Sequence, residues 1–218
     1  MPTKATLCIF EKAPLSGLVK TRLAPFLTTV EAAGLAAAFF ADTFALASSC
    51  DWARVVVACD GDPSLLEIAP DTEVWPQGPG DLGERMERAL SLALESSKAA
   101  IIIGTDLPGL PRRFLDSAHF QLTGHDAIIG PSADGGFYLL GLQRCPSGLL
   151  RGIPWQSATT REHTVERLYS IGLTVAEAEP WFDVDEPTDL VRLAGLLREE
   201  RIWAPRTAGF LTGLRHCL

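Results

Sequence analysis

The sequence predicts an α/β fold in which a mainly parallel, mixed sheet lies between two layers of helices. Short apolar segments alternate along the chain with longer segments whose apolar residues recur at helical spacing, as in Ala33, Ala37, Phe40 and Phe44. The segment 99–106, AAIIIGTD, is apolar without alternation, which is typical of a strand covered on both faces. The 218 residues contain no repeat and no linker, so we expect 1–218 to form one three-layer domain.

The expected strands are short runs of apolar or β-branched residues bounded by charge, Gly or Pro. They cover 5–10 (ATLCIF), 54–60 (RVVVACD), 99–106, 126–131 (DAIIGP), 136–142 (GFYLLGL) and 173–179 (LTVAEAE).

The expected helices cover 28–48, 84–97, 111–122, 159–171 and 187–198. Pro111 suits the first position of its helix, and Thr159 with Glu162 predicts a capping box at the start of the fourth. The tail after Glu200 is less regular, and we assign no element to it.

Composition and charge exclude several classes of protein. Hydrophobic residues make up 47% of the chain and charged residues 21%, which excludes disorder. A net charge of −8 argues against nucleic-acid binding, because neutralising many phosphates requires a basic surface. The N-terminal MPTKATLCIFEK meets charge too early for a signal peptide, and no apolar run approaches the roughly 18 residues of a membrane span.

The cysteines point to a reducing compartment. They are odd in number, scattered, and without a Cys-x-x-Cys pair, so we interpret them as reduced thiols of a cytoplasmic protein. They are Cys8, Cys50, Cys59, Cys145 and Cys217.

A basic loop follows the first expected strand, at the position where ligands bind in open α/β sheets. The stretch EKAPLSGLVKTRL (11–23) places Lys12, Lys20 and Arg22 around Gly17 in an otherwise acidic protein. Arg offers a forked donor and Lys a point charge for phosphate oxygens, while Gly lets the backbone come close to a ligand. This loop therefore predicts a phosphate clamp.

Carboxylates follow other strands at the same edge of the sheet. Asp106 follows the strand at 99, and Asp183 and Asp185 follow the last strand. Carboxylates and phosphates repel one another unless a cation lies between them, and Mg²⁺ prefers one or two carboxylates together with phosphate oxygens and water. The pattern predicts a divalent metal at this edge.

Each of these features alone also has an ordinary structural interpretation. A strand-end Asp often caps a helix, Asp134-Gly135-Gly136 is a natural turn sequence, and the basic loop could be a solvated surface. Trp155, just before a helix, suits an acceptor pocket or the core about equally. Their shared position at one sheet edge favours a site, and neither a Walker A pattern nor G-x-G-x-x-G is present.

Five motifs in order carry a family resemblance: KAPLSGLVKTRL, GDLGERM, GTDLPGL, GPSADGGFYLLGL and WFDVDEPTDL. Together they resemble the GT-A-type nucleotide-diphospho-sugar transferase superfamily, over the span from Thr6 to about Arg206. Within it the chain is similar to a small bacterial group assigned as glycosyltransferases, to phospholactate guanylyltransferases and, more distantly, to molybdopterin nucleotidyltransferases.

The resemblance implies a Rossmann-like GT-A sheet, with a nucleotide over its first half and an acceptor over its second. Lys12, Lys20 and Arg22 match the phosphate-binding loop, which also contains Gly17. Asp106 and Asp185 match the ligands of Mg²⁺ or Mn²⁺, and with Lys20 they form the expected catalytic set. Gly135 and Gly136 match the turn beside the acceptor, where we also place Trp155.

The leading hypothesis is a metal-dependent transferase that acts on an activated nucleotide, as a nucleotide-diphospho-sugar transferase. Asp106 is not part of a D-x-D, so nucleotidyl transfer from a nucleoside triphosphate to a phosphorylated acceptor is the alternative. Hydrolysis of a nucleotide sugar and a non-catalytic nucleotide-binding module are weaker alternatives. The expected partners are a nucleoside triphosphate or nucleotide sugar and a small-molecule acceptor, with base, sugar, acceptor and oligomeric state left open.

Overall fold

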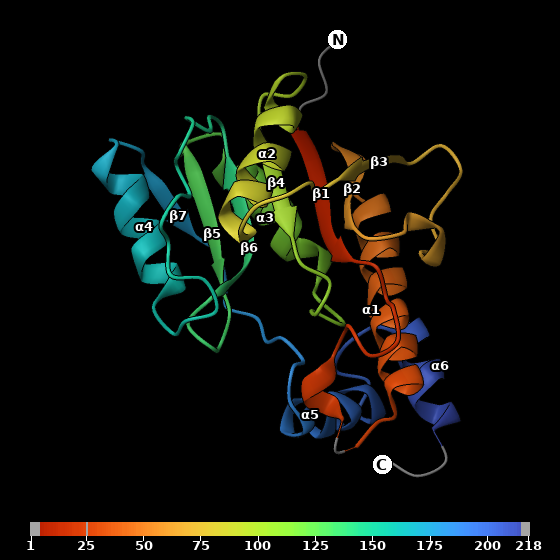
Figure 1. Ribbon diagram of the computed structural model, residues 1–218. Helices are drawn as coiled ribbons and strands as arrows, with labels where there is room; N and C mark the ends of the chain where they lie inside the picture. The colour runs from red at the N-terminus through yellow and green to blue at the C-terminus, as the bar shows by residue number, and fades with distance from the viewer. Residues whose placement is uncertain (1–4, 25, 215–218) are drawn as a thin grey trace.

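The computed structural model describes residues 5–24 and 26–214 and contains one mixed sheet of seven strands (Figure 1). The strand order is β3-β2-β1-β4-β6-β5-β7, and only β6 runs antiparallel to its neighbours in that part of the chain. The strands are Ala5–Lys12 (β1), Ala53–Asp60 (β2), Glu73–Pro76 (β3), Ala100–Ile103 (β4), Ala127–Pro131 (β5), Phe137–Leu142 (β6) and Val175–Glu177 (β7). The predicted α/β class with a mainly parallel mixed sheet is confirmed.

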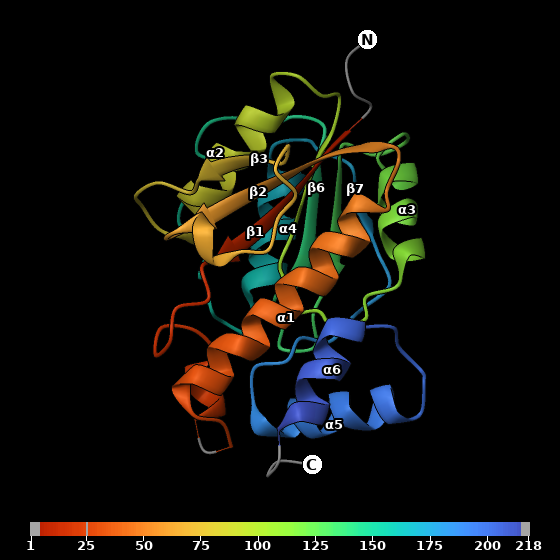
Figure 2. The same cartoon turned by 90° about the vertical axis from the view of Figure 1, so that its right-hand side faces the viewer.

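Helices cover both faces of the sheet and its carboxyl edge. In the apolar clusters, α1 and α3 pack on one face and α2 and α4 on the other (Figure 1). The helices α5 and α6 pack with the first half of α1 beyond the carboxyl edge (Figure 2). The six helices described are Thr29–Ser48 (α1), Leu82–Leu94 (α2), Arg112–Gln121 (α3), Thr160–Ser170 (α4), Pro187–Arg198 (α5) and Pro205–Gly213 (α6).

The first strand shows why the central strands lack polar alternation. Successive side chains of a strand point to opposite faces. In β1, Leu7 and Ile9 pack in the same cluster as Phe40 of α1, while Cys8 packs with Leu90 of α2. Each large apolar side chain buried in this way contributes roughly 1.5–3 kcal/mol.

One strand and one α-helix were not predicted from the sequence. The edge strand β3 has only four residues, EVWP, and ends in Pro76, so it carries no extended apolar run. The tail forms α6, which contains Gly209 and Gly213, both poor helix formers. Tertiary packing against α1 stabilises α6: the ring of Phe210 lies so close to Gly34 that a Cβ there would come within 2.5 Å of it.

The expected capping box at Thr159 is wrong. No hydrogen bond from the start of α4 reaches the Thr159 side chain, whose hydroxyl bonds Ser157 instead. Capping boxes that were not predicted from the sequence occur at other helix starts. Thr28 and Glu31 form the box of α1, and Asp81 and Glu84 form the box of α2.

The helix α1 is the segment that tests the expectation that no apolar run is long enough to span a membrane. By length and composition alone it could cross a membrane, since its 20 residues have a mean hydropathy of 1.5. Half of its apolar window is buried within the fold, including Phe39 and Phe40. A core helix of this kind passes the same test of length and composition.

The strand order places a crevice between β1 and β4. From β1 the chain passes to β2 on one side, whereas β4 pairs with β1 on the other. The loops that leave the carboxyl ends of β1 and β4 therefore diverge, and in open α/β sheets such a switch point is where ligands bind. The chain ends β1 with Glu11 and Lys12 and follows β4 with Gly104, Thr105 and Asp106 at this point.

We expect Thr28→Ala to lower the free energy of unfolding by about 1 kcal/mol, because it removes the N-cap acceptor of α1. The Thr28 hydroxyl accepts the Glu31 backbone N–H at 3.2 Å, and the Glu31 carboxylate accepts the Thr28 N–H at 2.8 Å. Thr159→Ala is the matched control, since Thr159 precedes α4 without capping it. Urea denaturation of both variants checks this, and an equal loss in the two would contradict it.

Candidate active site

A cleft of about 770 Å³ opens at the switch point between β1 and β4. Its wall is formed by the end of β1, the loop 18–22, the residues that follow β4, and the segment before α5. Five residues predicted from the sequence line it together: Lys12, Lys20, Arg22, Asp106 and Asp185. The structure therefore brings the basic loop and the two carboxylates into one cavity.

Lys20 lies at the centre of this arrangement. Its ammonium Nζ is 2.7 Å from Asp106 Oδ1 and 3.0 Å from Asp185 Oδ1, and it also donates to the carbonyl of Val184. The Lys20 side chain is only 5% exposed, whereas the two carboxylates are 46% and 39% exposed. Burial lowers the pKa of Lys20, but the charges of Asp106 and Asp185 more than offset it, so the pKa is raised and the ammonium keeps its proton.

Backbone contacts hold the two carboxylates side by side. The N–H of Val184 donates to the carbonyl of Asp106 at 3.0 Å, which joins the loop after β4 to the segment before α5. The Asp189 carboxylate accepts the N–H groups of Asp185 and Glu186 at 3.2 and 2.9 Å. The start of α5 thereby fixes the backbone position of Asp185.

The carboxylates of Asp106 and Asp185 are the cleft residues that could hold a divalent cation. Both carboxylates already face one positive charge, the Lys20 ammonium, so their oxygens converge on a common point. Among the described residues no group of three or more His, Cys, Asp or Glu could hold a metal by itself. Two carboxylates match Mg²⁺ or Mn²⁺ that takes its other ligands from phosphate and water, rather than a closed protein cage.

Glu11 is a cleft residue that the sequence analysis missed. Its side chain is buried, and its carboxylate accepts the Thr105 hydroxyl at the point where β1 and β4 end. Burial raises the pKa of Glu11 to about 8; the Thr105 hydrogen bond opposes this rise and the negative charge of Asp106 adds to it. A carboxyl at the end of a buried strand, directly before Lys12, was the available signal.

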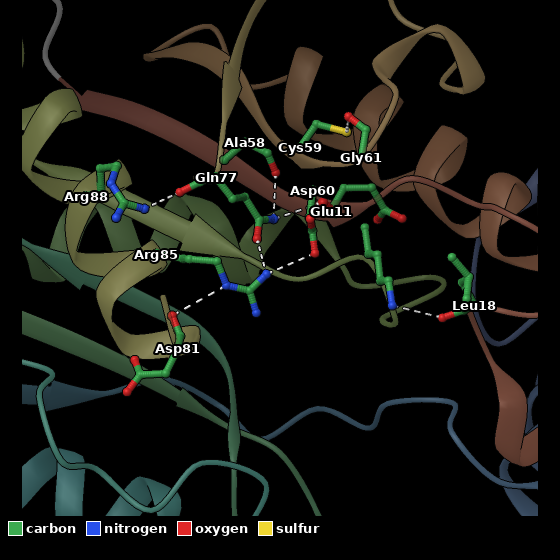
Figure 3. Close-up of polar contacts among 11 residues, drawn as sticks. Glu11, Leu18, Ala58, Cys59, Asp60, Gly61, Gln77, Asp81, Arg85 and Arg88 are labelled. Atoms are coloured by element: carbon green, nitrogen blue, oxygen red, sulfur yellow. Dashed lines mark hydrogen bonds and ion pairs between the residues drawn. The ribbon is translucent and has the colours of Figure 1, made fainter. Parts of the chain in front are cut away.

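Arg85 forms a second polar cluster in the cleft, with Asp60 and Gln77 (Figure 3). Its guanidinium Nη1 donates to Asp60 Oδ2 at 3.0 Å and to Gln77 Oε1 at 2.9 Å, and its Nε contacts the carbonyl of Asp81 at 3.4 Å. Gln77 is itself buried, and its amide donates to the carbonyls of Glu11 and Ala58 (Figure 3). The sequence analysis used GDLGERM only for the family resemblance and gave Arg85 no role.

The basic loop contributes three residues with different surroundings. The Lys12 ammonium donates to the carbonyl of Leu18 at 3.1 Å, which closes the loop on itself. Gly17 has a φ of +82°, a conformation that favours glycine, and has no atom within 4 Å of its Cβ position. Arg22 is exposed on the cleft wall, and within residues 5–24 and 26–214 its guanidinium makes no hydrogen bond or ion pair.

The predicted acceptor residues lie at the second half of the sheet. Gly135 has a φ of +89°, and a Cβ there would come within 2.0 Å of the carbonyl oxygen of Ala158. The N–H of Gly136 donates to Asp134 Oδ1 at 2.9 Å, and Asp134 and Ala158 both line the cleft. Trp155 lies behind this wall, where its indole packs on Gly83 and edge-on against Phe137.

Asp183 and Asp185 take different positions, as alternation along an extended segment predicts. Asp185 lines the cleft and contacts Lys20, whereas Asp183 is not part of the cleft wall. Burial, followed by the charges of Asp134, Asp185 and Asp106, raises the pKa of Asp183 to about 6.

A family model described as "Uncharacterized protein conserved in bacteria (DUF2064)" matches residues 41–157, more than half of the chain. The chain belongs to the DUF2064 family. The matched span runs from the middle of α1 to Ser157 and includes Asp60, Arg85, Asp106 and Gly135 of the cleft region. Among proteins with curated descriptions, none matches this DUF2064 chain.

Solved structures share the fold of this DUF2064 member. A protein from Desulfovibrio desulfuricans G20, described as a "putative nucleotide-diphospho-sugar transferase", is 29% identical with a TM-score of 0.86, covering 96% of this chain and 94% of that chain. A CMP:2-keto-3-deoxy-manno-octonic acid synthetase complexed with CTP has 12% identity and a TM-score of 0.59, with coverages of 90% and 99%. Rv0371c from Mycobacterium tuberculosis H37Rv, in complex with manganese, has 17% identity and a TM-score of 0.55, with coverages of 88% and 98%.

These likenesses confirm the GT-A and nucleotidyltransferase type of fold and the resemblance to nucleotide-diphospho-sugar transferases. At 12% and 17% identity the second and third structures show the fold alone. Four cysteines predicted as thiols, Cys8, Cys50, Cys59 and Cys145, are free, and Cys217 lies outside the described residues.

We expect Glu11→Gln to flatten the pH dependence of stability. A Glu11 pKa that rises from 4.5 to about 8 on folding means that the native state keeps a proton lost by the unfolded chain. The protonated Glu11 carboxyl contributes fully to the free energy of unfolding below pH 4.5, and this contribution is lost as the pH rises to about 8. Between these two pH values the free energy of unfolding of the wild type should fall by roughly 1–3 kcal/mol more than that of the variant.

Urea denaturation at several pH values, without nucleotide or metal, measures this difference. Glu166→Gln is the control, because Glu166 is exposed on α4 and should leave the wild-type profile unchanged. Parallel pH profiles for the wild type and Glu11→Gln would show that Glu11 ionises normally.

Proposed function

We propose that this DUF2064 protein is a metal-dependent transferase that uses a nucleotide-diphospho-sugar as donor. The observation that carries the proposal is the contact of Lys20 with Asp106 and Asp185 at the switch point of the sheet. Asp106 and Asp185, balanced by Lys20, line the same cleft as Arg22, whose guanidinium has no partner among the described residues. This arrangement suits a phosphate ligand that arrives with a metal.

The cleft offers a separate place for each part of such a substrate. Arg22 and Lys12 line the cleft and would face the diphosphate, while Asp60 and Arg85, which pair with each other, line it as well and would face the nucleoside. Asp106 and Asp185 would hold the metal, which when bound would stabilise negative charge on the leaving phosphate. The Lys20 ammonium, next to both, adds positive charge at the same point.

In glycosyl transfer, the bond between the anomeric carbon of the sugar and the diphosphate oxygen breaks, and an acceptor oxygen forms a bond to that carbon. The nucleoside diphosphate leaves, and the acceptor proton passes to water or to a carboxylate of the cleft. The acceptor would approach along the turn at Gly135 and Gly136, next to Asp134 and Ala158 of the cleft wall. Trp155 would support that side from behind rather than touch the acceptor.

Nucleotidyl transfer is the second candidate, and the same cleft favours it through one observation. Three cations line the cleft together with Asp106 and Asp185, the proposed metal ligands: Lys12, Lys20 and Arg22. Three positive charges suit a triphosphate as well as a diphosphate. In that reaction an acceptor phosphate would attack the α-phosphorus, and pyrophosphate would leave.

A thermal-shift panel tests the proposal. Nucleoside triphosphates and nucleotide sugars are compared with and without Mg²⁺ or Mn²⁺, because a bound ligand raises the melting temperature according to its affinity and concentration. We expect one nucleotide class to stabilise the protein only with metal, and incubation with that class and candidate acceptors then identifies the bond that is broken. The absence of stabilisation by every nucleotide, with or without metal, would overturn the proposal.

We expect Asp106→Asn to keep the fold and to lose the metal-dependent part of nucleotide stabilisation. An amide is a much weaker ligand for Mg²⁺ than a carboxylate, and Asp185 still pairs with Lys20 in the variant. Metal titrations in the presence of nucleotide measure the loss. The control is Asp71→Asn at an exposed site; an unchanged metal requirement in Asp106→Asn would remove Asp106 from the metal site.

We expect Arg22→Ala to weaken nucleotide binding by about tenfold to a hundredfold, because a charge-assisted contact to phosphate contributes roughly 1.5–3 kcal/mol. The melting temperature without ligand should stay near that of wild type, since Arg22 is exposed on the cleft wall. Isothermal titration calorimetry measures the affinity, with Arg151→Ala as an exposed control. Wild-type affinity together with a lowered melting temperature would instead assign Arg22 a structural role.

A further inference from the structure

A second cavity, of about 450 Å³, lies behind the loop that carries Asp106. It is lined by the second half of α1, by Leu107–Pro111, by the start of α3 and by the connection from α5 to α6. The cleft and this rear cavity share no lining residue, although Asp106 lines one and Leu107 lines the other. The nucleotide proposed above leaves the rear cavity unused.

Three arginines line the rear cavity: Arg112, Arg113 and Arg201. Within the described residues, Arg113 makes no ion pair, and its guanidinium lies 4.9 Å from the centre of the Phe114 ring. Arg201 has one weak contact, at 3.4 Å, with Glu199 two residues away. At least two of the three cations are therefore available to an anion.

The acidic groups near the rear cavity are already engaged. Asp42, which lines it, accepts the backbone N–H groups of Arg206 and Thr207 at 3.0 and 2.9 Å and so fixes the start of α6. Asp51 and Asp116 bond Arg112 at 3.1 and 3.3 Å. The lining thus carries three positive charges against one negative charge, in a protein whose net charge is −8.

The rear cavity also offers apolar surface for a flat group. Trp203 lines it with a side chain 84% exposed, which makes it the most exposed of the large hydrophobic residues described. Leu107 and Leu110, which are buried, form part of its wall. An indole that lines the same cavity as arginine side chains suits a ligand with a ring that stacks and an anionic group that pairs with arginine.

We propose that the rear cavity is a second ligand site that binds a small aromatic anion, meaning a planar ring joined to a phosphate or carboxylate group. Trp203 stacks on the ring, and Arg113 and Arg201 hold the anionic group. An occupant of the rear cavity contacts Leu107, which directly follows the proposed metal ligand Asp106 in the chain.

Phenyl phosphate and phenylacetate serve as the two probes. Two half-probes serve as controls: inorganic phosphate, which has the anionic group without the ring, and benzyl alcohol, which has the ring without the anionic group. In isothermal titration calorimetry we expect an aromatic anion to bind the wild type at least about tenfold more tightly than either half-probe, because ring and charge are recognised together. The comparison of the two probes distinguishes a phosphate ligand from a carboxylate ligand. Binding of neither probe at millimolar concentration would overturn the proposal.

Variants locate the probe. Trp203→Ala and Arg113→Ser should each weaken binding by about tenfold or more, while Trp203→Phe retains most of it because the ring remains. The matched controls Phe120→Ala and Arg151→Ser, both at exposed sites outside the rear cavity, should bind as wild type.

Arg22→Ala separates this proposal from the proposed function. Arg22 lines the cleft and not the rear cavity, so its removal should leave probe binding unchanged even though we expect it to weaken nucleotide binding. Loss of probe binding in Arg22→Ala would place the probe in the cleft and overturn the second site. Wild-type binding in both Trp203→Ala and Arg113→Ser would overturn it as well.

Discussion

The arrangement of the cleft depends on one buried cation between two carboxylates. Without the ammonium of Lys20, Asp106 and Asp185 would repel each other at the edge of the sheet, and the segment before α5 would lose its side-chain contact with the basic loop. The N–H of Val184 donates to the carbonyl of Asp106, and this backbone hydrogen bond holds the segment before α5 to the loop after β4 independently of charge. Because the carboxylates are more exposed than the ammonium, a ligand can reach them from the cleft while Lys20 stays covered.

The sequence predicted the fold well because its strongest signals are local. The run at 99–106 is apolar on both faces, and the structure covers β4 with helices on each side. The signals failed where packing decides the structure, since β3 is four residues long and α6 includes Gly209 and Gly213. The start of α4 shows the limit of motif matching, because the Thr159 hydroxyl bonds Ser157 although Glu162 stands at the capping-box position.

The candidate site was predictable where residues lie in the loops that follow strands, and it was missed at Glu11, which lies on β1 itself, and at Arg85. Lys20, Arg22 and Asp106 lie in the loops that follow β1 and β4, so the rule for parallel sheets located them. Arg85 projects from α2 and is held by Gln77, a contact between segments that no spacing in the sequence reveals. The catalytic and metal-binding roles are proposed for Lys20, Asp106 and Asp185.

The reversed strand β6 has a consequence for how this fold can diversify. Because β6 runs antiparallel to β5, a short hairpin turn joins the two strands at the carboxyl edge, where parallel neighbours would need a crossover helix. The turn at Gly135 packs against Ala158, and the Gly135 carbonyl accepts the N–H of Arg161 in α4 at 3.0 Å. Lengthening this hairpin would therefore change the cleft wall near Asp134 and the start of α4 together, while the pairing of the seven strands stays the same.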